Sequence, residues 1–150
     1  MRYFIFLCLF LTLISCSKPE KSCNVKGLIK TANMYFNAEK SKNWDFTYEL
    51  RYEEFKESVP VSVYVNQMNK DSKGWKMISY TLGKFKISTN QAEILVEVKE
   101  EVPIKLRVNE ESSITFKGIL KFVCKNNEWY ILEAPSRNHF SLNTAIVPLN

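Results

Sequence analysis

Glycine and histidine are scarce in this sequence, and their scarcity excludes several kinds of site. The chain of 150 residues has four glycines and one histidine. Glycine-rich phosphate loops and the GxSxG nucleophile motif need closely spaced glycines, and a histidine-based metal site needs several imidazoles. The sequence contains none of these patterns and no CxxC pair. We therefore predict no catalytic residue, no cofactor-binding residue and no metal ligand.

The few side chains that could act as a catalytic acid or base are also poorly placed. Asp45 and Asp71 are expected on helix or loop surfaces, and His139 lies in an irregular tail. The pairs Glu100-Glu101 and Glu110-Glu111 are expected in solvent, because they flank expected loops and consecutive strand residues point to opposite faces. We therefore predict a non-enzymatic protein, since an enzyme would need a polar cluster that this pattern does not show.

The charge distribution argues against a nucleic-acid partner. The formal net charge is +5, but the lysines are scattered among nearly as many acids. Domains that bind nucleic acid gather their basic side chains on one face. The pattern instead indicates a solvated surface, whose mild positive balance favours proximity to anionic lipid head groups.

The N-terminus carries an export signal. Arg2 supplies a positive charge, and Tyr3 to Leu13 form an apolar run too short to span roughly 30 Å of hydrocarbon. The motif Leu13-Ile14-Ser15-Cys16 resembles the lipobox of bacterial lipoproteins, in which the cysteine thiol receives diacylglycerol before cleavage. The resemblance implies a signal peptide over residues 1–15, lipidation at Cys16 and a place in the cell envelope. An ordinary secretory signal with a chance cysteine is the alternative.

A short polar tether is expected after the lipidated cysteine. Residues 16–23 contain Pro19 and no apolar periodicity. The stretch from Ser17 to Ser22 reaches about 20 to 30 Å when extended, so the folded domain stays near the bilayer. A protein or envelope-polymer partner must meet the domain there. Ser17, in place of an aspartate, resembles outer-membrane sorting in Gram-negative cells.

Cysteine usage predicts one disulfide. Cys8 leaves with the signal and Cys16 is lipidated, so Cys23 and Cys124 remain in an oxidising compartment. Cys23 precedes the first expected helix, and Cys124 lies on the apolar face of an expected strand. We predict that the two are bonded. Two unpaired, buried thiols are the alternative.

Three helices are expected in the first half of the chain. The first follows the N-cap candidate Asn24, and the second begins near Asn43 and carries aromatics on one side as far as Phe55. Ser58 and Pro60 begin the third, although the alternation from Val61 to Val65 fits a strand equally well. The first helix buries a stripe of apolar residues: Val25, Leu28, Ile29, Ala32 and Phe36.

Period-two alternation then predicts about four antiparallel strands. The first runs from Trp75 to Ile87 and is bent at Gly83. The second begins at Ala92, and its alternation continues through Val102, Ile104, Leu106 and Val108, with Pro103 marking an edge or a bend.

The last two strands are expected at Ile114 to Lys125 and at Trp129 to Leu132. A tight reversal at Asn126-Asn127-Glu128 joins them. The tail that follows has no strong period, and its structure is left open. Phe140 is one of the apolar residues that could dock it on the domain.

Helices followed by an antiparallel meander indicate an α+β fold. The chain also resembles the nuclear transport factor 2-like superfamily, and small domains of unknown function carried by bacterial lipoproteins. The likeness covers residues 24–134 and leaves residues 135–150 as a C-terminal tail. It rests on hydrophobic rhythm and a few aromatics in four segments: Ala38 to Leu50, Phe55 with Val59-Pro60, Asn90 to Val98, and Asn127 to Leu132.

The resemblance implies a cone in which three N-terminal helices pack on a curved antiparallel sheet of about four strands around a cavity. Some relatives use this cavity as an active site or ligand pocket. The inward strand positions then give the expected cavity lining: Ile94, Val96, Val98, Phe116, Leu120 and Phe122.

Two kinds of function fit these expectations. The first is a membrane-anchored, non-enzymatic module that binds an envelope protein or polymer. The second is a carrier of a small apolar ligand in the cone cavity, which requires an open space of roughly 300 Å³ or more. A cryptic enzyme is the third and least favoured reading.

Overall fold

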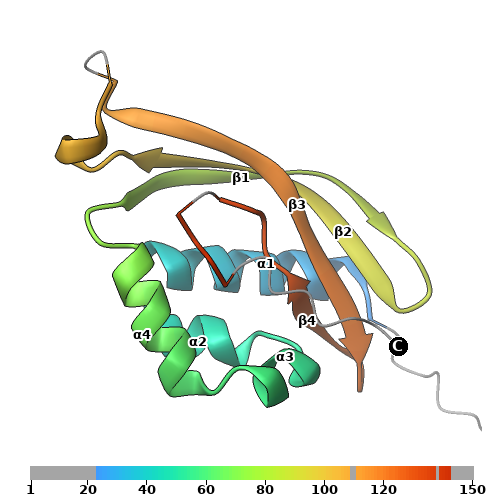
Figure 1. Cartoon of the computed structure of the whole chain (residues 1–150). Coiled ribbons are helices and arrows are strands. Elements are labelled where there is room, and N and C mark those ends of the chain that lie inside the picture. The colour runs from blue at the N-terminus through green and yellow to red at the C-terminus, as the bar shows by residue number, and fades with distance from the viewer. Residues whose placement is uncertain (1–22, 109–110, 138, 143–150) are drawn as a thin grey trace, which may run out of the picture.

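The computed structural model describes residues 23–108, 111–137 and 139–142. In this part of the chain, four helices precede four strands, which confirms the α+β class. Figure 1 shows the sheet curving over the first helix, with the other three helices beyond it. The helices are α1 (Val25–Lys40), α2 (Trp44–Glu49), α3 (Glu53–Ser58) and α4 (Val61–Asp71).

The four strands form one antiparallel sheet in chain order, as the alternation predicts. Cross-strand pairing is regular along the whole length of the central pair. A short 3-10 helix, η1 (Ile104–Leu106), lies between the second and third strands. The strands are β1 (Lys76–Ile87), β2 (Gln91–Glu101), β3 (Ser113–Lys125) and β4 (Glu128–Glu133).

Helix α1 covers the concave face of the sheet. Its cap is Asn24, whose side-chain oxygen accepts a hydrogen bond from the Gly27 backbone N–H at 2.8 Å. Leu28, Ala32 and Phe36 of the expected stripe are fully buried against the sheet, whereas Val25, which was also expected to be buried, is 45% exposed at the first turn. Burial of side chains as large as leucine or phenylalanine contributes about 1.5–3 kcal/mol each, so this stripe fixes α1 on the sheet.

The single helix expected from near Asn43 is two helices, so the prediction of three helices is wrong. The chain leaves the helical conformation after Leu50, the C-cap of α2, and Arg51 pairs with Ile131 of strand β4. The Ile131 N–H donates to the Leu50 carbonyl at 2.8 Å, and the Tyr52 N–H donates to the Ile131 carbonyl at 3.0 Å. These two hydrogen bonds replace helical ones, which explains why α2 ends before α3 begins.

The segment after Pro60 is a helix, α4, rather than a strand. Tyr64 and Met68 are fully buried one helical turn apart. They lie in a second core cluster formed by α2, α3, α4 and the tail: Trp44, Tyr48, Phe55, Tyr64, Met68 and Phe140.

Strand β1 has the expected irregularity at Gly83. The pairing with β2 shifts register between Leu82 and Phe85. A Cβ atom on Gly83 would lie 3.2 Å from the Leu95 carbonyl oxygen, which is closer than most side chains tolerate. The glycine therefore permits the bulge that keeps Leu82 over the core while the strand bends.

The interior of the sheet is a packed core. Five of the six residues expected to line a cavity, Ile94, Val96, Val98, Leu120 and Phe122, are at most 1% exposed and belong to one cluster with the stripe of α1. Phe116 is the exception, because it is half-buried and lies outside that cluster. Its ring contacts those of Trp75 and His139 instead.

The strand expected through Val108 ends earlier. Strand β2 stops at Glu101, and Ile104, in η1, is 79% exposed. Pro103 has no N–H to continue the ladder, and the Leu106 N–H donates instead to the Pro103 carbonyl at 2.8 Å. The alternation of apolar residues in this segment therefore does not correspond to a buried face.

The disulfide between Cys23 and Cys124 is present, as predicted. The two Cα atoms lie 6.0 Å apart, within the usual range for a disulfide. The bond fastens the start of α1 to β3. The β3–β4 reversal beside it also follows the sequence, with positive φ angles at Asn126 and Asn127 that suit a tight hairpin turn.

Packing continues beyond residue 134, the expected end of the domain. Arg137 and Phe140 are buried, and the Phe140 ring meets Trp44 edge-on at a centroid distance of 5.9 Å. The Ser141 N–H and hydroxyl both donate to an Asp71 carboxylate oxygen. The first part of the tail therefore belongs to the folded domain.

Candidate functional site

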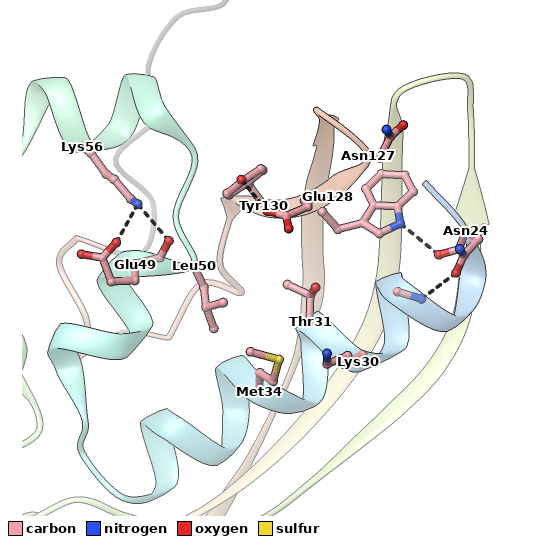
Figure 2. A pocket seen from close by; sticks show the side chains of 12 residues that line it. Asn24, Lys30, Thr31, Met34, Glu49, Leu50, Lys56, Asn127, Glu128 and Tyr130 are labelled. Carbon is pink, nitrogen blue, oxygen red and sulfur yellow. Dashed lines mark hydrogen bonds and ion pairs between the residues drawn. The ribbon is translucent and has the colours of Figure 1, made fainter. Parts of the chain in front are cut away.

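A groove of about 490 Å³ lies between the N-terminal half of α1, the end of α2 and the start of β4. We call it the α1–β4 groove. Figure 2 shows Lys30, Thr31 and Met34 of α1 on one side, with Leu50 and Tyr130 across from them. Its lining is Asn24, Gly27, Lys30, Thr31, Met34, Glu49, Leu50, Lys56, Asn127, Glu128, Trp129 and Tyr130.

The end of the groove at the N-terminus of α1 is built around Trp129. Its indole N–H donates to the Asn24 carbonyl at 3.0 Å, and its side chain is almost fully buried. Gly27 lies beside this ring, and a Cβ at Gly27 would be in ordinary contact with the indole Cδ1, at 3.5 Å. Asn24 directly follows the disulfide-bonded Cys23, so this end of the groove is rigidly attached to β3.

Both signs of charge surround the groove. The Lys56 ammonium donates to the Glu49 carbonyl at 2.9 Å and to its carboxylate at 3.2 Å (Figure 2). The Tyr130 hydroxyl donates to the Glu128 carboxylate at 2.9 Å. Lys30 is exposed on α1. The groove therefore offers donors and acceptors to a polar ligand instead of one uniform charge.

A second, smaller hollow of about 300 Å³ shares Lys56 and Tyr130 with the groove. Lys125 forms an ion pair with Glu53 here. The hydrogen bond and charge of Lys125 lower the pKa of Glu53 from its ordinary value. Its lining is Arg51, Tyr52, Glu53, Lys56, Lys125, Asn126 and Tyr130.

A buried ion cluster lies between the sheet, α1 and the tail, and it includes Glu100, which was expected in solvent. Arg137 Nη1 donates to Glu100 Oε1 at 2.8 Å, and Nη2 donates to both Glu39 oxygens at 2.7 and 2.6 Å. The Tyr35 hydroxyl donates to Glu39 Oε1 at 2.7 Å. The side chains of the three charged residues are at most 3% exposed. The prediction that Glu100 is solvated is therefore wrong.

A signal for this cluster is present in the sequence. Glu39 continues the α1 stripe one turn beyond Phe36, and Glu100 continues the inward alternation of β2 beyond Val98. Periodicity alone therefore places both carboxylates on buried faces. Arg137 lies in the aperiodic tail, and no comparable pattern identifies it.

The electrostatics of the cluster follow from burial and pairing. Burial, followed by the negative charge of Glu39, raises the pKa of Tyr35 well above its ordinary value. Burial raises the pKa of Glu100, but His139 and Arg137 outweigh this effect and leave the pKa lowered overall. Burial lowers the pKa of Arg137, and its two carboxylates more than offset the effect. The paired, charged state is thus the stable one.

His139 packs on the edge of the cluster. Its ring stacks on Trp75 at a centroid distance of 4.0 Å, and Nε2 lies 3.2 Å from Glu100 Oε2 without the alignment of a hydrogen bond. The expectation of a histidine packed by the tail fits this position. Because Glu39 and Glu100 are already engaged by Arg137, we assign the cluster a structural role.

Arg51 is buried in a different way. None of its three guanidinium nitrogens has a hydrogen-bond partner among the residues that the structure describes, although the side chain is fully buried. Its guanidinium carbon lies 4.1 Å from the centre of the Phe55 ring. This cation–π contact gives Arg51 a favourable neighbour but satisfies none of its N–H groups.

Replacing Arg51 with methionine is expected to raise the free energy of unfolding by about 1–3 kcal/mol, because it removes unsatisfied buried donors. Urea unfolding of the purified protein measures the change. Arg51→Lys is the control, and it should give no gain because it keeps a buried charge. A loss of stability in Arg51→Met would mean that Arg51 has a partner in solution.

Residues 23–108, 111–137 and 139–142 hold no group of three or more histidine, cysteine, aspartate or glutamate side chains that could bind a metal ion. No helix in these ranges is both long enough and apolar enough to cross a bilayer. The predicted lipidation residue, Cys16, lies outside the described residues.

Comparison with known proteins gives no functional assignment. No family model matches the chain, and no curated protein matches it. Among solved structures, a SEC-C motif-containing protein from Rhodopseudomonas palustris is similar over 64% of this chain and 67% of its own, with 10% identity and a TM-score of 0.49. A likeness at this level carries no argument about function.

Proposed function

We propose that this chain is a lipid-anchored protein of the cell envelope and that its domain is a non-enzymatic binding module. The anchor is diacylglycerol on Cys16, and residues 1–15 are the signal peptide. In a Gram-negative cell, Ser17 favours the outer membrane. The binding site is the α1–β4 groove, and its ligand belongs to an envelope protein or polymer.

The observation that carries this proposal is the position of the groove. It begins at Asn24, the residue that joins the tether region to α1. The Cys23–Cys124 disulfide fixes that junction to the sheet. A tether with a reach of about 20 to 30 Å therefore holds this end of the domain at the membrane surface, where envelope components are available.

We also propose that the fold is a variant of the nuclear transport factor 2-like cone. Support comes from helix α1, which packs on the concave face of a bent antiparallel sheet, with the other three helices beyond it (Figure 1). The expected cavity residues other than Phe116 are packed against α1, which favours a surface binding module over a carrier with an internal ligand.

Replacing Cys16 with serine is expected to abolish membrane association, because serine has no thiol to accept the lipid. Membrane fractionation of cells that express the full chain, with mass spectrometry of the N-terminus, measures the effect. Cys8→Ser is a matched control within the discarded signal and should leave processing unchanged. An acylated, membrane-bound Cys16→Ser protein would contradict the proposed anchor.

A further inference from the structure

Strand β4 has an edge that β3 does not cover, and Trp129 lies on it. The Ile131 N–H and carbonyl point away from β3, since they bond to Leu50 and Tyr52. Residues two apart on a strand direct their backbone groups to the same side, and pairing with β3 is regular from Trp129 to Ile131. The Trp129 N–H and carbonyl therefore point away from β3 as well, and no partner for them occurs among the described residues.

We propose that the α1–β4 groove binds an extended peptide segment, which pairs its backbone with this edge at Trp129. The inference rests on the proposed function, because it takes the groove to be the binding site. It goes further by naming the ligand as peptide rather than glycan polymer. Addition of a strand to an unpaired sheet edge is a common mode of peptide recognition.

The molecule already uses this edge in the same way. Arg51 forms a parallel bridge to Ile131 and Tyr52 is extended, immediately beside the groove. Leu50 also lines the groove, so a peptide at Trp129 would lie next to this internal segment on the same strand. The edge is therefore able to accept extended backbone.

The side chains around the groove suit a peptide. Met34 and Leu50 offer apolar surface, whereas Lys30, Glu49 and Glu128 offer charges of both signs. The carboxylates disfavour a polyanion. The unpaired N–H and carbonyl of Trp129 match the carbonyl acceptors and N–H donors that alternate along a peptide backbone. A volume of about 490 Å³ lies within the range of ligand pockets.

The test uses the mature, lipidated protein in detergent and a heptapeptide selected by display from a random library. Isothermal titration measures binding of that synthetic peptide, its backbone N-methylated analogue and a tetramer of N-acetylglucosamine. Two variants accompany it: Thr31→Trp fills the groove, and Lys26→Trp places the same side chain on exposed α1 surface outside it.

We expect Thr31→Trp and N-methylation each to weaken peptide binding about tenfold or more, and Lys26→Trp to leave it unchanged. The Trp129 amide should become protected from hydrogen exchange when the peptide binds. A peptide held only by side-chain contacts would not protect this amide. Unfolding curves for both variants establish that each is folded.

Other results would overturn the inference in distinguishable ways. One such result is that the tetrasaccharide binds, that Thr31→Trp weakens its binding, and that no selected peptide binds. The groove would then remain a binding site, but its ligand would not be a peptide. Peptide binding with an unprotected Trp129 amide would remove the edge pairing. Absence of binding by either probe would contradict both this inference and the proposed function of the groove.

Discussion

Replacing Arg137 with methionine is expected to lower the free energy of unfolding by about 3–5 kcal/mol, because it leaves two buried carboxylates without their cation. Arg137 makes hydrogen bonds to both Glu39 and Glu100, and all three side chains are at most 3% exposed. Denaturant unfolding near neutral pH measures the loss. Arg51→Met is the matched control, since the same substitution at an unpaired buried arginine is expected to stabilise the protein.

The pH dependence of stability provides a second measurement on the same variant. The pKa of Glu100 is lowered from 4.5 in the folded protein, so its stabilising contribution is complete above the unfolded value. That contribution is lost as the pH falls through the lower, folded pKa. Without Arg137 the pKa of Glu100 should rise toward or above its unfolded value, so the loss of stability on acidification should shrink or reverse, because protonation relieves an unpaired buried carboxylate. An unchanged acid limb in Arg137→Met would contradict the assigned role of the ion pair.

Removing the disulfide by the double substitution Cys23→Ser and Cys124→Ser is expected to lower the free energy of unfolding by about 4–5 kcal/mol, if loop closure in the unfolded chain dominates. The bond joins residues 101 positions apart, so its loss frees a long loop. Urea unfolding of the variant, beside the reduced and oxidised parent protein, measures the effect.

Reduction of the parent protein should reproduce most of that loss, since it breaks the same bond without changing the sequence. Labelling of free thiols in the oxidised, denatured protein should find neither Cys23 nor Cys124. Full labelling of both residues would show that the bond does not form in the cell envelope.

The sequence predicts α1, the β2 alternation and the disulfide well, because each depends on information that is local or restricted. The buried stripe of α1 and the alternate residues of β2 have the periods of their elements. Cys23 and Cys124 were the only pair left after the signal and the lipidated cysteine were set aside. Gly83 marked a bend in the sequence, and the structure supplies the physical reason, since a Cβ there would approach the Leu95 carbonyl.

Two elements could not be predicted because distant backbone decides them. Aromatics from Trp44 to Phe55 have helical spacing. The helix nevertheless ends at its C-cap Leu50, whose carbonyl accepts a hydrogen bond from the Ile131 N–H, about eighty positions later in the sequence. The apolar alternation through Val108 predicts a half-buried strand, but its apolar residues after Pro103 are exposed, and the chain forms a 3-10 helix there instead. Periodicity identifies a face but does not supply the surface that buries it.

For the candidate site, the sequence by itself predicts the anchor and the tether, and it places Trp129 at the start of the last expected strand. Tertiary structure alone decided that Trp129 meets Asn24, which forms one end of the groove, and that Leu50 covers part of the β4 edge and leaves the rest open. The buried cluster has the same origin. Periodicity placed Glu39 and Glu100 inward, but a buried carboxylate is stable only beside a cation, and the fold brings Arg137 to them from 98 and 37 positions away.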